Sequence, residues 1–180
     1  MRKEILLILA LSLGLSLASA QSPYAGEELR SYKSLSPTEV ESLRTGQGMG
    51  FAKLAELNHY PGPRHVLELR DKLGLSPSQV AETEALFENM HVSAVALGEE
   101  LIDAEMRLDL EFQQGSISPE SLQSALLAIG RLRARLRYVH LEAHLRQRSL
   151  LTAEQIARYD ELRGYRGATH DHDGHPKSHN

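Results

Sequence analysis

The chain has 180 residues and a formal net charge of −4. This length predicts one modest domain, and the acidic balance argues against nucleic acid as a partner. The sequence contains no cysteine, which excludes both a disulfide framework and a thiolate metal site. We therefore expect the fold to be stabilised by packing.

The first 20 residues have the pattern of a secretory signal peptide. Arg2 and Lys3 precede the apolar run "ILLILALSLGLSL", and the small residues "ASA" follow it as an A-x-A cleavage site. The run is too short, and too closely followed by the cleavage site, to favour a permanent membrane span. We expect a soluble, exported product that begins at Gln21 and has no permanent membrane span once the signal is cleaved.

A phrase that recurs along the chain predicts where helices begin. Its copies are "LSPTEV" from Leu35, "LSPSQV" from Leu75, "ISPESL" from Ile117 and "LTAEQI" from Leu151. In each copy a Ser or Thr can accept a hydrogen bond from a backbone N–H of the first helical turn. Apolar residues before and after this cap have the spacing of a hydrophobic staple. The phrase thus starts helices, and nothing in it points to catalysis.

Two long helices are predicted on either side of the turn "QQGSIS". Apolar and small residues recur at alternating spacings of three and four from residue 77 to 112, and again from 119 to 148. Residues 82–111 carry nine acids against one arginine, whereas 119–148 carry six arginines against two glutamates. The sequence therefore predicts an all-α fold, in which a long antiparallel helical hairpin is flanked by short helices.

The remaining segments have different characters. Residues 21–50 are predicted to be flexible or weakly helical, because Gly46, Gly48 and Gly50 interrupt the weak helix that follows Ser36. Residues 51–165 form the hairpin domain, and residues 166–180 are too polar to fold alone and are predicted to be a disordered tail. Two long amphipathic helices cannot bury both faces in so small a chain, so we expect a homodimer.

The phrase L-[ST]-x-x-Q at 75–79 and 151–155 resembles the signature of the bacterial periplasmic Spy/CpxP family. The stretches "GMGFAKLAELNHYPGPRHVLELRDKLGLSPSQ" and "VHLEAHLRQRSLLTAEQIARYDELRGY" are similar to its heavy-metal-sensor branch, and the likeness covers roughly residues 48–165. The resemblance implies an all-helical, dimeric periplasmic protein. It also implies one of two functions: a metal-responsive sensor of envelope stress, or an ATP-independent chaperone. Its partners would then be a membrane signalling protein or unfolded envelope proteins.

Several histidines have the spacing of metal ligands. His140 and His144 stand four apart on one helix face, where the resemblance also implies ligands, and Glu88 and His91 form a second pair one turn apart. An antiparallel register centred on "GSIS" places the two pairs level with each other. Imidazole nitrogen suits zinc, nickel, cobalt or copper, which the sequence does not distinguish. The resemblance implies a further ligand, His65. The alternative is that these are partly exposed histidines that bind nothing.

Two further clusters have alternative interpretations. The tail histidines could bind divalent ions weakly or only solubilise the chain: His170, His172, His175 and His179. An arginine cluster could pair with the acidic helix or form a basic, partly apolar cradle for unfolded clients: Arg131, Arg133, Arg135 and Arg137.

Enzymatic signatures are missing from the sequence. It contains no glycine-rich phosphate loop after a strand, no nucleophile elbow and no second E-x-x-H motif. We therefore predict that the protein is not an enzyme. The predicted function is a periplasmic protein that senses or buffers a divalent transition metal ion. The alternative is a chaperone that holds unfolded clients.

Overall fold

The computed structural model describes residues 22–165, and the predicted signal peptide and tail lie outside this range. Its elements, in chain order, are the 3-10 helix η1 (Glu27–Leu29) and the helices α1 (Pro37–Arg44), α2 (Lys53–Glu56), α3 (Pro63–Glu68), α4 (Arg70–Leu73), α5 (Pro77–Gln113), α6 (Pro119–Leu150) and α7 (Ala153–Leu162). No strand occurs in the described range, which confirms the predicted all-α fold. Within that range, no helix combines the length and apolar character that crossing a membrane requires.

The chain divides between Ser31 and Tyr32 into two compact units. The described part of the first unit contains η1, beside which Arg30 forms an ion pair with Glu27 at 3.0 Å. The second unit contains α1 to α7. All candidate site residues within the described range therefore belong to the second unit.

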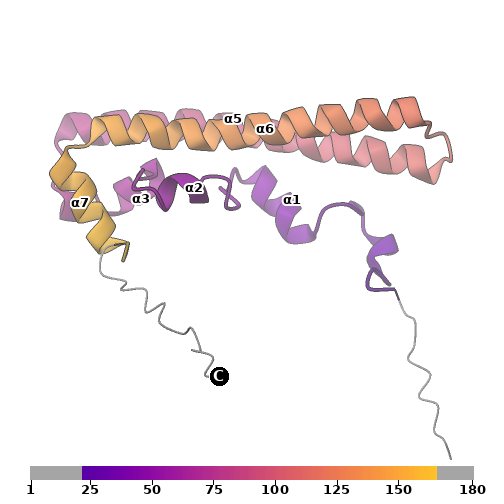
Figure 1. Cartoon of the computed structure of the whole chain (residues 1–180), viewed down its shortest axis with the longest axis horizontal. Coiled ribbons are helices and arrows are strands. Elements are labelled where there is room, and N and C mark those ends of the chain that lie inside the picture. Colours follow the sequence, from indigo (N-terminus) through magenta and orange to yellow (C-terminus); the bar gives the residue numbers. More distant parts are fainter. Residues whose placement is uncertain (1–21, 166–180) are drawn as a thin grey trace, which may run out of the picture. The chain divides into compact units, whose positions relative to one another are not determined.

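Helices α5 and α6 pack side by side along their length (Figure 1). Both begin and end within two residues of the bounds that the sequence predicts. Across the hairpin, Gln147 Nε2 donates to Thr83 Oγ1 at 3.2 Å, and Arg133 donates to Glu105 Oε1 at 2.7 Å. The two pairs lie on either side of the register that the sequence predicts, each within about one helical turn of it. The antiparallel hairpin is thus confirmed.

The recurring phrase does start helices. In each copy, the Ser or Thr side chain accepts a hydrogen bond from a backbone N–H of the first turn, in α1, α5, α6 and α7. Each cap is a reciprocal capping box. At the start of α6, Ser121 takes the place of the usual Glu or Gln, and its Oγ accepts from Ser118 N at 3.0 Å.

Two copies of the phrase also contact each other. Gln79 Nε2 donates to Gln155 Oε1 at 2.8 Å, and Gln155 Nε2 donates to Gln79 Oε1 at 3.1 Å. Gln79 Nε2 also reaches the Leu150 carbonyl oxygen at 2.8 Å. Because each glutamine also caps its own helix, the pair ties the start of α5 to the start of α7. The capping pattern alone gave no sign of this contact.

Helix α1 packs into the main core, although it falls in the segment predicted to be flexible or weakly helical. Leu35, Val40 and Leu43 are buried with apolar residues of α5 and α6. The approach is close at Gly98 of α5, where a Cβ atom would collide with the Leu43 carbonyl. Only glycine therefore allows α1 to lie against α5 at this point.

A second apolar cluster closes the end of the hairpin opposite its turn. Residues of α3, α4 and α7, with the α6–α7 junction, form it: Val66, Leu73, Leu151 and Tyr159. Partly buried side chains that include Leu69, Ile156 and Tyr165 pack around it. The cluster holds α7 beside the segment between α2 and α3, and this arrangement positions the candidate site.

Candidate metal centre

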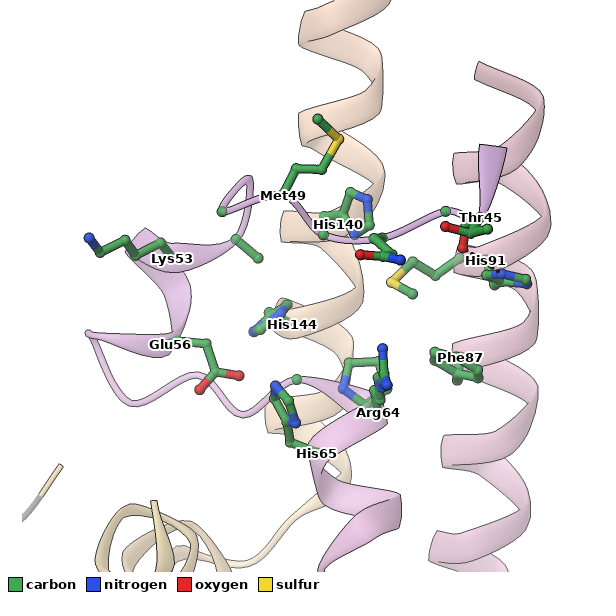
Figure 2. Close-up of a pocket in the computed structure, with 18 residues that line it drawn as sticks. Thr45, Met49, Lys53, Glu56, Arg64, His65, Phe87, His91, His140 and His144 are labelled. Atoms are coloured by element: carbon green, nitrogen blue, oxygen red, sulfur yellow. Dashed lines mark hydrogen bonds between the residues drawn. The ribbon is translucent and has the colours of Figure 1, made fainter. Parts of the chain in front are cut away.

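A cavity of about 340 Å³ lies beside the open half of the hairpin. Its walls come from the α1–α2 segment, from α2, from the start of α3, and from the facing sides of α5 and α6 (Figure 2). Four of the five predicted ligands line this cavity: His65, His91, His140 and His144. The fold thus brings histidines from three separate helices to one pocket.

His144 is buried and held in one orientation. Its Nδ1 lies 2.8 Å from the Tyr60 carbonyl oxygen. Because a carbonyl oxygen only accepts, Nδ1 carries the proton and Nε2 presents its lone pair. Histidine ligands commonly have this arrangement, in which a backbone carbonyl fixes the tautomer of the ring.

Gly62 makes room for the His144 ring. A Cβ atom at this position would lie 2.9 Å from His144 Nε2 and 3.1 Å from Glu56 Oε1. Glycine is therefore required here, since a side chain would overlap with the ring. The same geometry places the Glu56 carboxylate and the unprotonated nitrogen of His144 on one side of Gly62.

His140 lies one turn before His144 and is only 3% exposed. Its ring stacks on Phe51, with 5.8 Å between the ring centroids. Its Nε2 has no hydrogen-bond partner within the described part of the chain. Burial, and secondarily the nearby His144, lower the pKa of His140 to about 4. The ring is therefore neutral near pH 7, with a buried polar nitrogen that only an added group can satisfy.

His91 faces the cavity from α5 (Figure 2). Its Nε2 lies 3.1 Å from the Thr45 carbonyl oxygen, so Nε2 donates and Nδ1 keeps the lone pair. The ring stacks on Phe87, with 5.8 Å between the ring centroids. A Cβ atom on Gly46 would lie 2.9 Å from this ring, so the α1–α2 segment packs tightly over it.

The fifth predicted ligand, Glu88, is exposed and does not line the cavity. The carboxylate that does line it is Glu56 of α2. The sequence pattern did not indicate Glu56, because the predicted hairpin register relates positions on the two long helices only. The one signal for it was its place in "LAELNHYPGPRH", three residues before His59 and nine before His65.

The histidines nearest Glu56 in sequence have carboxylate partners of their own. His65 Nδ1 lies 2.9 Å from Glu68 Oε2, and this hydrogen bond is the main cause of the lowered pKa of Glu68. His65 points toward the same space as Glu56 and His144 (Figure 2). His59 Nδ1 lies 2.9 Å from Asp160 Oδ2 of α7, and His59 does not line the cavity.

The donor set suits a borderline divalent ion, but it is not gathered around one point. Among residues 22–165, no three His, Asp or Glu side chains are placed closely enough to hold a metal ion as they stand. The chemistry fits nonetheless, because His144 Nε2 presents a lone pair, the buried Nε2 of His140 has no partner among the described residues, and a carboxylate lies beside His144. Closing the site around an ion requires one side chain to move.

The four arginines of the predicted cradle have different surroundings. Arg133 pairs at 2.7 Å with Glu105, whose side chain is only 8% exposed, and Arg135 lies 3.7 Å from Glu100. Arg131 and Arg137 are exposed, and no ion pair with another described residue is found for either. Exposed apolar side chains share α6 with them: Leu126, Leu127, Tyr138 and Leu145.

Comparison of the chain with family models, with curated proteins and with solved structures gives no match.

Proposed function

We propose that the protein binds a divalent transition metal ion in this cavity and senses or buffers that ion in the periplasm. The observation that carries the proposal is the buried Nε2 of His140, which has no partner in the described residues. A buried polar atom without a partner costs about 1–3 kcal/mol. A coordinated ion would remove this cost and would use the lone pair of His144 as well.

The donors favour zinc, nickel, cobalt or copper over calcium or magnesium, because neutral imidazole is a poor ligand for the hard cations. His140 and His144 would supply two nitrogens, and Glu56 an oxygen. His65 lines the same cavity as Glu56 and would be a further ligand (Figure 2). His91 approaches from α5 and offers Nδ1. The tail histidines, outside the described residues, would add weak sites.

The proposal includes a homodimer and a membrane signalling partner. Large apolar side chains remain exposed on both helices of the hairpin: Val92, Met106, Leu110, Phe112, Leu126, Leu127, Tyr138 and Leu145. Exposed apolar groups of this number suit an interface between protein chains. A second copy of the hairpin would cover them.

Calorimetric titration with each of the four ions tests the metal proposal. The full chain should bind one ion tightly, and deletion of residues 166–180 should remove only weak sites. His140→Ala with His144→Ala should weaken tight binding by at least about 100-fold, since two ligands are lost. Glu88→Gln is the matched control and should leave affinity unchanged, because Glu88 lies outside the cavity. Tight binding by the double variant would refute the proposal.

A chaperone that holds unfolded clients is the second candidate, and one observation favours it. Arg131 and Arg137 lie exposed on α6, which also carries exposed apolar side chains. This basic, partly apolar surface would suit segments of an unfolded client protein. Arg131→Glu with Arg137→Glu should then abolish suppression of client aggregation while the helical content is kept. Equal suppression by wild type and variant would argue against this surface.

A further inference from the structure

The Glu56 carboxylate faces two helices at once. On one side it lies next to the Nε2 of His144, across the space that Gly62 leaves open. On the other side it accepts hydrogen bonds from α7 and from the residues just after it: Tyr159 Oη reaches Oε1 at 2.9 Å and Oε2 at 3.0 Å, and Tyr165 Oη reaches Oε2 at 3.1 Å. One carboxylate thus contacts both the histidine pocket and the last helix.

Both tyrosines donate hydrogen bonds to Glu56, but they are buried to different extents. Burial and the adjacent Glu56 raise the pKa of Tyr159, and burial raises the pKa of Tyr165, so both phenols keep their protons. Tyr159 is 1% exposed and belongs to the apolar cluster of α3, α4 and α7. Tyr165 follows the end of α7 and is only partly buried. Tyr165 is therefore the contact that can open first.

The segment between α2 and α3 is fixed from the α6 side as well. His144 Nδ1 donates to the Tyr60 carbonyl oxygen at 2.8 Å, and Arg148 donates to the His59 carbonyl oxygen at 2.6 Å. These bonds fix the backbone of the segment and the ring of His144. The Glu56 side chain is the more adjustable partner, because it projects from a short helix on several rotatable bonds.

A bound metal ion would compete with Tyr159 and Tyr165 for the Glu56 carboxylate. While the tyrosines hold the carboxylate, no three candidate ligands of the described residues are gathered tightly enough to hold an ion. Ligands of zinc lie about 2.0–2.2 Å from the ion. Because the His144 ring is fixed by the Tyr60 carbonyl, closing the site around an ion would draw the Glu56 carboxylate further into the histidine pocket and away from α7.

We propose that Glu56 couples the histidine pocket to α7: an ion bound at His144 draws the carboxylate from Tyr165 and loosens the C-terminal end of α7. The coupling rests on the proposed metal binding. It makes the end of α7, which leads into residues 166–180, the part of the protein that changes with metal occupancy. A signalling partner would then distinguish the two states at this end.

Zinc titration and hydrogen exchange of the full chain test the coupling. Saturation with zinc should speed amide exchange about tenfold or more at residues 160–165 while the α5 and α6 amides of the hairpin stay protected. Tyr165→Phe should bind zinc about fivefold more tightly than wild type, because it removes a competing donor. Tyr138→Phe, an exposed tyrosine of α6, is the matched control and should bind as wild type does.

Two further results separate the outcomes. Glu56→Gln should abolish the zinc-dependent change in α7 exchange. If Tyr165→Phe or Tyr159→Phe binds zinc more weakly than wild type, the tyrosines support the ligand rather than compete for it, and the coupling is overturned. Zinc binding that requires His140 and His144 but leaves α7 exchange unchanged would overturn the coupling and leave the proposed function standing. No binding that depends on these histidines would overturn both.

Discussion

The two ends of the α5–α6 hairpin bury different kinds of side chain. Toward the turn, the core is aliphatic and includes Leu101, Ile102, Ile129 and Leu136. The buried charged residue at this end, Glu105, is paired with Arg133 at 2.7 Å. Toward the open end, most of the buried polar groups are gathered: Thr83, His140, His144, Gln147 and Asp160.

The aliphatic end stabilises the fold, and the polar end carries the groups that could have a function. Aliphatic side chains are sufficient to hold two helices together, and each contributes about 1.5–3 kcal/mol on burial. Buried histidine, glutamine and aspartate bring a desolvation cost that leucine would not. Buried polar and titratable groups cluster at functional sites in proteins. The open end of the hairpin is therefore the better candidate for a functional site.

The aliphatic end should be the more sensitive of the two to loss of packing. Leu101 is 1% exposed, so Leu101→Ala should lower the free energy of unfolding by about 2–5 kcal/mol. Denaturant unfolding of the metal-free protein measures this loss. Leu110→Ala, at a position that is 42% exposed, is the control and should change stability by less than about 0.5 kcal/mol. A loss of under about 1 kcal/mol at Leu101 would contradict the assignment of the packing core.

The polar end should make stability depend on pH. The pKa of His140 is about 4 in the folded chain, against an ordinary 6.5. Between these values the unfolded chain binds a proton that the folded chain does not, so stability is full above pH 6.5 and falls as the pH drops toward 4. The loss from this one group should be about 3 kcal/mol.

Unfolding curves of wild type and His140→Gln, measured without metal from pH 7 to pH 4, test this dependence. The substitution should flatten the curve, because glutamine does not titrate. Leu101→Ala should be less stable throughout but keep the wild-type slope. Identical slopes for wild type and His140→Gln would show that His140 is not held neutral by burial.

The paired glutamines should give the smallest of these effects. Gln155→Ala removes the partner of Gln79 and the reciprocal part of the α7 cap, so it should cost about 1–3 kcal/mol. Gln123→Ala, at an exposed position of α6, should be neutral within about 0.5 kcal/mol. Comparison of the two variants by thermal unfolding checks the prediction, and equal stability would show that the amide contact contributes nothing.

The sequence predicted the hairpin because local signals define it. Caps at Ser76 and Ser118, a periodic apolar face and one short turn are sufficient to set the bounds and register of α5 and α6. Two features needed tertiary information. The first is the docking of α1, which depends on the close approach of Leu43 to Gly98. The second is the contact between Gln79 and Gln155, each of which also belongs to the capping box of its own helix.

The candidate site could be predicted only in part for the same reason. His140 and His144 share a face of one helix, so their spacing identified them without any model of the fold. Glu56 lies on a four-residue helix whose position depends on tight turns and on Gly62. Helical periodicity cannot place such a residue, and it favoured Glu88, which is exposed and does not line the cavity.

The most direct test of the metal pocket is the nitrogen-15 resonances of the histidine rings, recorded on the full chain as zinc is added. We predict that one equivalent of zinc shifts the Nε2 resonances of His140 and His144 first, while Nδ1 of His144 stays protonated against the Tyr60 carbonyl. The tail histidines should respond only at higher zinc concentration. The proposed metal site at His140 and His144 is contradicted if the first equivalent of zinc shifts only the tail resonances and leaves these two rings unchanged.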